Sequence, residues 1–398
     1  MPDISTEENI YDGNEFPRTY VETDSGALRR NYRALTSLCC GDGCAPVAVV
    51  KAGAYGHGPD ICVPVLLEEG CRMFAVATVH EALEVRGLCD NFGTDAGILI
   101  LGRSDPRLAP LIAERRIDQA CMSYGYAREL SDALQGGTLG IHIAVDTGMN
   151  RIGFPAFCPE DVRRSTGEIV SLGALPGLRI DGMFSHFARA DDRTPEADAR
   201  TRLQGERFVM LSDALASAGT DPGIRHICNS AASVRFPEYR FDACRFGILL
   251  YGLAPSPDVT LPLEPVLALR ARVSQVHRLR KGEEVGYGGT FTAVRDSELA
   301  TLPVGYADGF LRAYSGAEIV LRSPSGGLKG RGRIVGRICM DMCMADVTGL
   351  GAAEGDSATL IGEPGQLDAL ASLASTINYE CVSLLSSRLP RIRKDRTD

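Results

Sequence analysis

Eight short apolar runs recur between residues 46 and 252, and this repetition constrains the fold more than any other feature. Most runs are separated by segments with the apolar spacing of amphipathic helices. Runs that are apolar throughout are typical of strands buried on both faces of a parallel sheet. Eight strand–helix units of this length predict a (β/α)8 TIM barrel, with a doubly wound open sheet as the structural alternative. The runs are PVAVVK (46–51), MFAVAT (73–78), GILILG (97–102), DQACMS (118–123), GIHIAVD (140–146), IDGMFSHF (180–187), IRHICNS (224–230) and CRFGILLYG (244–252).

The sequence changes character after YGLAPSPDVTLP. From about residue 264, segments such as LALRARVSQVHRL, ELATLPVG and SATLIG alternate with turns, which predicts a mainly β C-terminal domain. We expect one final helix near 366–386 to close this domain. The chain is therefore divided into a polar N-terminal arm (1–16), a barrel domain (17–262) and a C-terminal β-domain (263–398).

Composition argues against several classes of protein. The net charge of −9 and the lack of a basic run argue against a nucleic-acid partner. No stretch approaches the ~20 apolar residues of a membrane span, and the N-terminus lacks the apolar core of a signal peptide, so we expect a cytoplasmic protein without a membrane partner. The 13 Cys show no CxxC pair and no metal-like spacing, which predicts free thiols and no metal site. P-loop, HExxH and GxSxG motifs are missing.

Several chemically active side chains stand where the predicted strands end, which in a TIM barrel is the catalytic face. Lys51 ends the first run; such an amine can simply reach solvent, or it can be a Schiff-base nucleophile if its pKa is lowered. Arg151 follows the fifth run and offers a fork for a carboxylate. His186 ends the sixth run and Ser230 begins a helix after the seventh, where an anion is stabilised. Gly247 in the eighth run permits close approach to the backbone.

Nine motifs occur in the order found in the alanine racemases, and the chain resembles that family over residues 17–392. The resemblance implies a pyridoxal-phosphate enzyme with a barrel and a β-domain, which interconverts L- and D-alanine by a two-base mechanism. It also implies a homodimer, because each β-domain would complete the active site of the partner subunit. The motifs are VVKAGAYGHG, VDTGMNRIGF, FSHFARAD, CNSAAS, RFGILLYGL, VGYGGTFTA, LPVGYADGF, GRICMDMCMADV and TINYE.

The resemblance assigns roles to the matching residues. Lys51 and Tyr287 are implied as the two catalytic bases, on opposite faces of the α-carbon. Arg245 is implied to donate a hydrogen bond to the pyridine nitrogen of the cofactor, with His186 holding it in position. Since an Arg hardly gives up a proton, the ring would be a weak electron sink, which limits transamination. The other implied cofactor contacts are Tyr55, Asn229, Ser230, Gly247, Ile248 and Tyr379.

Further matches concern the amino-acid substrate. The resemblance implies that Arg151, Met340 and Asp341 bind it, with Met340 contributed by the partner subunit. A narrow polar access corridor would select small zwitterions. The implied corridor residues are Asp191, Tyr306, Arg312, Arg337 and Ile377.

The chain departs from the family pattern at two positions. Gly53 stands where Asn is common, which puts the local hydrogen bonding of that loop in doubt. Ala144 stands where many members carry a Lys modified to a carbamate, so we predict no lysine carbamate. A bound chloride serves instead in some relatives, and Asn150 could help to hold one near Arg151.

Three alternatives stay open. The substrate could be serine or another small amino acid, because an apolar pocket poorly rejects one added hydroxyl group. Decarboxylases share the barrel and β-domain, but they favour an acidic partner for the pyridine nitrogen, and Arg245 argues against this. A non-catalytic carrier of pyridoxal phosphate would be expected to lack Tyr287 or Arg151, and this chain retains both.

Overall fold

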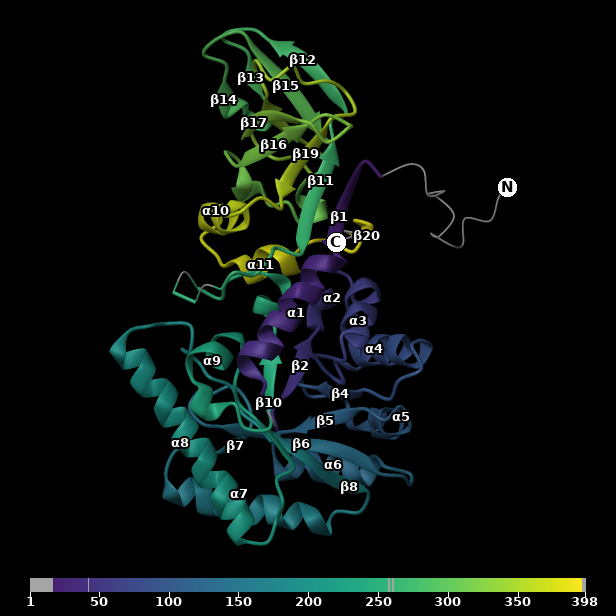
Figure 1. Ribbon diagram of the computed structural model, residues 1–398, viewed down its shortest axis with the longest axis vertical. Helices are drawn as coiled ribbons and strands as arrows, with labels where there is room; N and C mark the ends of the chain where they lie inside the picture. Colours follow the sequence, from purple (N-terminus) through teal and green to yellow (C-terminus); the bar gives the residue numbers. More distant parts are fainter. Residues whose placement is uncertain (1–16, 42, 257, 260, 396–398) are drawn as a thin grey trace, which may run out of the picture. The chain divides into compact units, whose positions relative to one another are not determined.

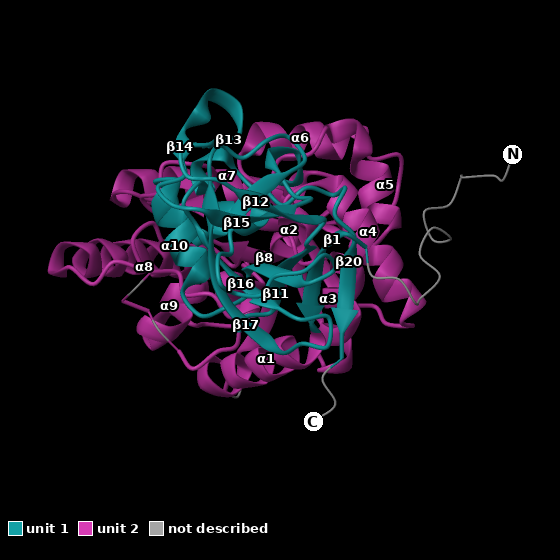
Figure 2. Cartoon of the chain, turned by 90° about the horizontal axis from the view of Figure 1, so that it is seen from above, with its two compact units in different colours: residues 1–24, 265–397 teal, residues 25–264, 398 magenta. Residues whose placement is uncertain are grey.

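The computed structural model describes residues 17–395 except 42, 257 and 260 (Figure 1), so the predicted N-terminal arm (1–16) lies outside the described residues. The chain forms two compact units (Figure 2). Unit 1 comprises residues 1–24 and 265–397, and unit 2 comprises residues 25–264 with residue 398.

Unit 2 contains the predicted barrel. Its strands are all parallel and follow the order β10-β2-β3-β4-β5-β6-β8-β9. The backbone N–H of Arg245 donates to the carbonyl oxygen of Cys228 at 3.1 Å, which links the last strand to the segment after β9 and closes the ring. The barrel is therefore confirmed and the open sheet is wrong. The strands are β2 (Ala45–Val49), β3 (Met73–Val76), β4 (Gly97–Ile100), β5 (Asp118–Cys121), β6 (Leu139–Asp146), β8 (Leu178–Phe184), β9 (Ile224–His226) and β10 (Ala243–Phe246).

Helices connect the strands and surround the barrel (Figure 1). Their starts carry strong capping signals: Thr78 and Glu81 form a capping box, and Thr194 caps a helix that opens with Pro195. Among the described residues, no helix has the length and apolarity needed to cross a membrane. The helices are α1 (Ser25–Cys39), α3 (Pro59–Glu68), α4 (Val79–Asn91), α5 (Ala109–Glu114), α6 (Tyr124–Ala133), α7 (Pro159–Ser171), α8 (Pro195–Ser217) and α9 (Ser230–Arg235).

Unit 1 is the predicted β-domain. One mainly antiparallel sheet has the strand order β12-β15-β18-β17-β16-β19-β11-β1-β20, and a two-stranded ribbon joins β13 (Glu284–Val285) to β14 (Phe291–Thr292). The strands of the large sheet are β1 (Thr19–Asp24), β11 (Leu267–Arg272), β12 (Gln275–Leu279), β15 (Ser297–Leu302), β16 (Glu318–Arg322), β17 (Leu328–Val335), β18 (Cys343–Asp346), β19 (Ser357–Ile361) and β20 (Arg391–Lys394).

Two features of unit 1 differ from expectation. Residues 17–24, which we assigned to the barrel domain without predicting a strand there, contribute β1, which pairs antiparallel with β11 and parallel with β20. The single helix expected near 366–386 is divided into α10 (Gln366–Leu373) and α11 (Asn378–Ser383). The division has a local cause, because Ser375 has a left-handed φ of 54° that a continuing right-handed helix cannot contain.

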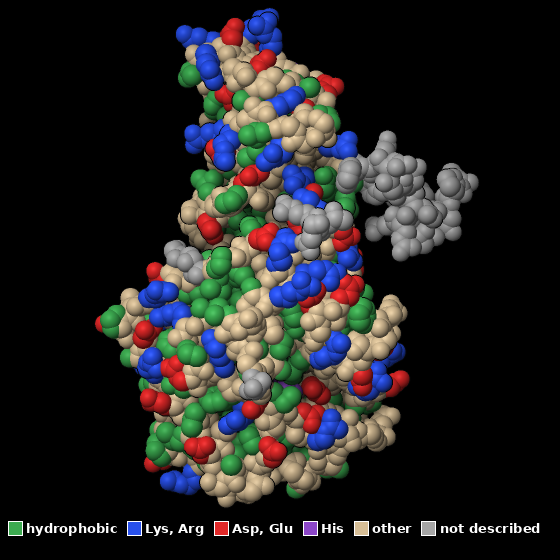
Figure 3. Space-filling view, viewed as in Figure 1, with side chains coloured by type: hydrophobic (Ala, Val, Ile, Leu, Met, Phe, Trp, Pro, Cys, Tyr) green, Lys and Arg blue, Asp and Glu red, His purple; other side chains and the backbone are tan. Residues whose placement is uncertain are grey.

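Charges of both signs are interspersed on the visible face of the molecule. Figure 3 shows Lys and Arg side chains alternating with Asp and Glu over the described residues of that face. Many charged residues of the protein form exposed ion pairs, such as Arg116 with Asp95 at 3.0 Å and Arg393 with Asp395 at 2.8 Å. Such exposed pairs contribute about 0–1 kcal/mol each, so they favour solubility of the surface more than stability of the fold.

Candidate active site

The backbone adopts a left-handed turn directly after Lys51. The short segment α2 (Lys51–Tyr55) follows β2, and its residues 52–55 have φ angles of 53°, 62°, 54° and 56°. Left-handed helical geometry costs roughly 1–2 kcal/mol for each residue that has a Cβ atom. Gly53 avoids this cost, and Asn tolerates the same region. The replacement of the family's common Asn by Gly53 therefore preserves the backbone conformation.

One carboxylate fixes this turn. The N–H of Ala52 donates to Oε1 of Glu81 at 2.7 Å, while Oε2 of Glu81 accepts from the N–H of Ala77 at 2.7 Å and of Thr78 at 3.2 Å. Glu81 thus ties the segment that follows Lys51 to the first turn of α4. Strained backbone persists only where its surroundings determine it this strongly, and such sites are often functional.

The surroundings of Lys51 favour a neutral amine. Burial, followed by the positive charge of Arg151, lowers the pKa of Lys51; Glu81 acts in the opposite direction, and Arg245 adds a further lowering. A lowered pKa increases the fraction of the nucleophilic neutral amine near neutral pH.

A cradle for an anion lies at the ends of β2 and β10. The N–H of Gly247 donates to Oγ of Ser230 at 2.9 Å. A Cβ atom at position 247 would lie 2.7 Å from Oη of Tyr55 and 3.7 Å from Oγ of Ser230, so only glycine leaves this space open. Burial raises the pKa of Tyr55 to about 12, which keeps its hydroxyl a hydrogen-bond donor. Ile248 begins the 3-10 helix η5 (Ile248–Tyr251). These donors fit a phosphate group.

Arg245 is almost completely buried, with 4% of its surface exposed. Its Nη1 donates to Nδ1 of His226 at 2.8 Å and to the carbonyl oxygen of the same residue at 2.8 Å. Its Nη2 donates to the carbonyl oxygen of Ser185 at 2.7 Å and to Nδ1 of His186 at 3.2 Å. Burial lowers the pKa of Arg245 to about 10, so the group stays a cation at neutral pH.

His186 lies between Arg245 and the first turn of α9. Its Nε2 lies 3.4 Å from Nδ2 of Asn229, and Oδ1 of Asn229 accepts from the N–H of Ala232 as the helix cap. Burial, followed by the charge of Arg245, lowers the pKa of His186 well below its usual value. The imidazole is therefore neutral, and it can accept a hydrogen bond from Arg245.

A small hollow of about 20 Å³ lies beside Arg151. Ala144 is buried in its wall, and a methyl group cannot carry a carbamate. The neighbouring loop is held by Oδ1 of Asp146, which accepts from the N–H groups of Gly148 and Asn150 at 3.0 Å each. A hollow of this size has room for one water molecule or a group of similar size. The lining residues are Ala144, Val145, Asp146, Met149, Arg151, Ile152, Phe184, Ser185 and His186.

Unit 1 carries most of the remaining predicted residues, and several are strongly exposed. Tyr287, at the start of the 3-10 helix η6 (Tyr287–Gly289), is 71% exposed, and Met340 and Ile377 are 54% and 60% exposed. Arg337 packs on the backbone beside Tyr287, since a Cβ atom at Gly288 would lie 2.9 Å from its Nη1.

The loops of Tyr306 and Asp341 are fixed within unit 1. The N–H of Tyr306 donates to the carbonyl oxygen of Cys339 at 3.1 Å. Asp341 accepts from Nη2 of Arg388 at 2.7 Å, so an ion pair already engages this predicted substrate contact. The predicted residues not yet placed are Arg312, which is exposed in η8 (Arg312–Tyr314), Tyr379, which is half-buried in α11, and Asp191, which is half-buried before α8 in unit 2.

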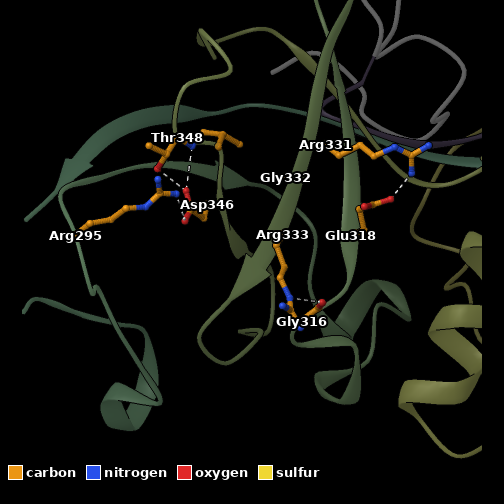
Figure 4. Close-up of a pocket in the computed structure, with 9 residues that line it drawn as sticks. Arg295, Gly316, Glu318, Arg331, Gly332, Arg333, Asp346 and Thr348 are labelled. Atoms are coloured by element: carbon orange, nitrogen blue, oxygen red, sulfur yellow. Dashed lines mark hydrogen bonds and ion pairs between the residues drawn. The ribbon is translucent and has the colours of Figure 1, made fainter. Parts of the chain in front are cut away.

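A larger cavity, of about 440 Å³, lies in unit 1 and contains none of the predicted site residues. Figure 4 shows its charged lining, in which Arg331 pairs with Glu318 and Arg333 donates to the carbonyl oxygen of Gly316 at 2.9 Å. Because these side chains already have partners, the cavity does not present a set of converging unsatisfied groups. Its lining residues are Arg295, Gly316, Glu318, Arg331, Gly332, Arg333, Asp346, Val347 and Thr348.

Two residues at the site were missed by sequence reasoning. The TVHE segment (78–81) is a capping-box signal that could have singled out Glu81. His226 stands in a predicted strand, and no local signal distinguishes it from a core residue. Among the described residues, no group of His, Cys, Asp and Glu could hold a metal ion.

Comparisons with known proteins agree with this architecture. Residues 23–255 match the family model "Alanine racemase, N-terminal domain", and residues 266–393 match "Alanine racemase, C-terminal domain". The alanine racemase of Clostridium tetani is 38% identical to this chain, and the aligned region covers 94% of each of the two sequences. The solved structure of an alanine racemase from Clostridium difficile 630 is 30% identical, with a TM-score of 0.87 over 96% of this chain and 97% of that one. The solved structure of a histidine racemase from Leuconostoc mesenteroides is 31% identical, with a TM-score of 0.83 over 95% of this chain and 98% of that one.

Proposed function

Because this chain belongs to the alanine racemase family, we propose that it interconverts L-alanine and D-alanine with pyridoxal phosphate. The observation that carries the proposal is the cluster in unit 2: the Lys51 amine of lowered pKa, the cradle at Gly247 and the buried Arg245. When bound, the cofactor supplies an electron sink that acidifies the α-proton of an amino acid. Lys51 would hold it covalently, and Tyr55, Ser230 and the backbone around Gly247 and Ile248 would hold its phosphate.

Two side chains of the chain move the protons in this proposal. Inversion of a stereocentre requires removal of a proton from one face and delivery of another to the opposite face. Nζ of Lys51 serves one face and Oη of Tyr287 serves the other, each acting as acid or base in turn. Arg245 stays a donor throughout, because its pKa of about 10 keeps it protonated at neutral pH.

The proposal requires a homodimer with shared active sites. Tyr287 and Met340 are exposed on unit 1, and each would complete the barrel site of the partner subunit. Exposed aromatic and methionine side chains suit such an interface, because these residue types are enriched in interface cores. Arg151 of the barrel would bind the substrate carboxylate by a charged fork.

A complementation experiment tests the shared site. The Lys51→Ala and Tyr287→Phe variants should each lose racemisation in both directions, because every turnover uses both bases, whereas a refolded mixture should recover about a quarter of the activity. The recovery arises because half of the dimers are mixed and each mixed dimer contains one intact site. No recovery, with mixed dimers demonstrated by mass spectrometry, would refute the shared site.

The reaction is tested by following optical rotation after reconstitution of the apoprotein with pyridoxal phosphate. We expect borohydride reduction to attach the cofactor at Lys51, as read by peptide mapping. L-alanine should give the highest kcat/KM, with slower turnover of L-serine. The structural similarity to a histidine racemase makes L-histidine the necessary third substrate, and a preference for it would replace alanine in the proposal.

A further inference from the structure

A chain of buried polar side chains crosses the interior of the barrel from Arg245. Nη1 of Arg245 lies 2.8 Å from Nδ1 of His226, and Nε2 of His226 lies 2.9 Å from Nδ1 of His142. Nε2 of His142 lies 3.5 Å from Oδ2 of Asp118. The four residues come from β10, β9, β6 and β5. Both imidazoles are essentially inaccessible to solvent.

The direction of every hydrogen bond in this chain follows from one residue. A guanidinium has no acceptor, so Nδ1 of His226 must offer its lone pair to Arg245. The proton of His226 is then on Nε2 and is donated to Nδ1 of His142. The proton of His142 is on Nε2 in turn and points to the carboxylate of Asp118. Protonation of either ring would set two N–H donors against each other, so both rings are neutral.

Two glycines provide the space for this chain. A Cβ atom at Gly182, on the strand between β6 and β9, would lie 2.3 Å from Nδ1 of His142. A Cβ atom at Gly140 would lie 2.1 Å from Oδ1 of Asp118. Any larger residue at position 182 would displace His142, and any larger residue at position 140 would displace Asp118. The barrel interior is therefore shaped around these polar groups at positions that usually carry branched apolar side chains.

The groups around Arg245 indicate what this row of hydrogen-bonded side chains can do. The hydrogen-bond acceptors of Arg245 are carbonyl oxygens and imidazoles, with no carboxylate among them. Asp118 is the first carboxylate along the chain of donors. Burial, followed by the charge of Arg245, lowers the pKa of His226 well below its usual value, in agreement with a neutral ring. Other titratable groups also face these residues. His186 lies 3.2 Å from Arg245, and Arg151, Tyr55, Cys228 and Cys244 surround Arg245. Cys244 also lies near His226, and Asp181, beside Gly140, is paired with Arg179.

We propose that His226, His142 and Asp118 are positioning residues that lock Arg245 as a one-directional hydrogen-bond donor to the cofactor. The inference rests on the proposed function, because it takes the cofactor ring as the partner of Arg245. If Arg245 were less firmly held, its hydrogen bond to the ring nitrogen would be weaker, and more turnovers would end in amino transfer. In that side reaction water hydrolyses the bond to the substrate, alanine leaves as pyruvate with the oxygen of that water, and the cofactor keeps the amino group.

The tautomers are tested first, in the apoprotein. Nitrogen NMR of 15N-histidine-labelled protein should show both rings neutral with the proton on Nε2 between pH 6 and 8. The signals are assigned with the His142→Asn and His226→Asn variants. A protonated ring, or a proton on Nδ1 of His226, would overturn the proposal. This measurement does not depend on cofactor or activity.

The function is tested by the ratio of pyruvate formed to alanine racemised in the holoenzyme. His142→Phe removes the acceptor of His226, and loss of one such hydrogen bond should raise this ratio about tenfold. His142→Asn keeps an acceptor oxygen near the position of Nδ1 and should restore a ratio near wild type. Asp118→Asn, at a partly exposed position, provides a milder change if His142→Phe does not fold, and it should raise the ratio in the same direction.

Gln119→Leu is the matched control. Gln119 is as deeply buried as His142 and lies on the same strand as Asp118. Its Oε1 accepts from Oγ of Ser104 and its Nε2 donates to the carbonyl oxygen of Gly102, at 2.6 Å each, away from Arg245. It should lower stability without changing the ratio. Equal ratios in the His142→Phe and Gln119→Leu variants would overturn the proposal. A wild-type protein that binds no pyridoxal phosphate would instead refute the proposed function and leave the NMR result intact.

Discussion

Replacement of Glu81 by Gln should loosen the backbone turn that follows Lys51. The carboxylate of Glu81 accepts three backbone N–H groups with its two oxygens: Ala52 on one side, and Ala77 and Thr78 on the other. Gln has one acceptor oxygen, and its amide nitrogen is a donor that must face one of these N–H sets. The substitution therefore leaves either the turn or the start of α4 without its acceptor.

The expected loss of stability follows from these contacts. A hydrogen bond to a charged group contributes about 1.5–3 kcal/mol, and partial exposure of Glu81 places it at the lower end, near about 1.5 kcal/mol. For a unit of this size, that corresponds to a decrease in Tm of the apoprotein of about 3–6 °C. The pKa of Lys51 should also fall further, because Glu81 is the group that raises it.

Two assays with one control examine this reasoning. Calorimetry gives Tm, and the rate of Lys51 modification by trinitrobenzenesulfonate, mapped by mass spectrometry at a series of pH values, gives the pKa of the amine. Glu84→Gln removes the same charge from the next turn of α4, where the carboxylate is exposed. The reasoning fails if Glu81→Gln lowers Tm no more than Glu84→Gln, or if the midpoint of Lys51 labelling does not move to lower pH.

Three further outcomes are expected. Gly247→Ala places a methyl group 2.7 Å from Oη of Tyr55, so spectroscopic titration of the apoprotein with pyridoxal phosphate should give a Kd raised at least about tenfold; an unchanged Kd would contradict the cradle. His186 and His226 are buried with lowered pKa values, so the unfolded state binds more protons than the folded state below about pH 6.5. Each ring should therefore lower the free energy of unfolding by about 1.4 kcal/mol when the pH falls to about 5.5. Urea titrations of the wild type and of His226→Asn at both pH values measure this loss. Since Ala144 cannot be carbamylated, activity should be independent of added bicarbonate, and a crystallographic carbamate on any Lys at the site would refute this.

Much of the fold was predictable because its signals are local. Each barrel strand overlaps one apolar run, since a parallel strand buried on both faces needs apolar residues throughout. The strand β1 was missed because its partners, β11 and β20, lie at the far end of the sequence. The break between α10 and α11 was missed because a left-handed residue is usually recognised in sequence as glycine, and position 375 is Ser.

The candidate site was predictable only in part. Lys51, Gly247 and Arg245 stand in motifs whose order identifies the family. His226 does not differ from a buried core histidine in sequence, and its importance depends on a contact with a residue 19 positions away. Gly53 has a φ of 62°, a backbone conformation that no sequence pattern reveals.

The pairing of β1 with β11 and β20 has a consequence for synthesis on the ribosome. Residues 25–266 separate β1 from β11, so at about 5–20 residues per second the emerging β1 waits roughly 10–50 s for its first neighbour. The barrel can close during that delay, whereas the sheet of unit 1 cannot be completed until Lys394 has been translated. The acidic residues Glu22 and Asp24 help to protect this waiting strand, because charged side chains on an unpaired strand disfavour premature association with other chains.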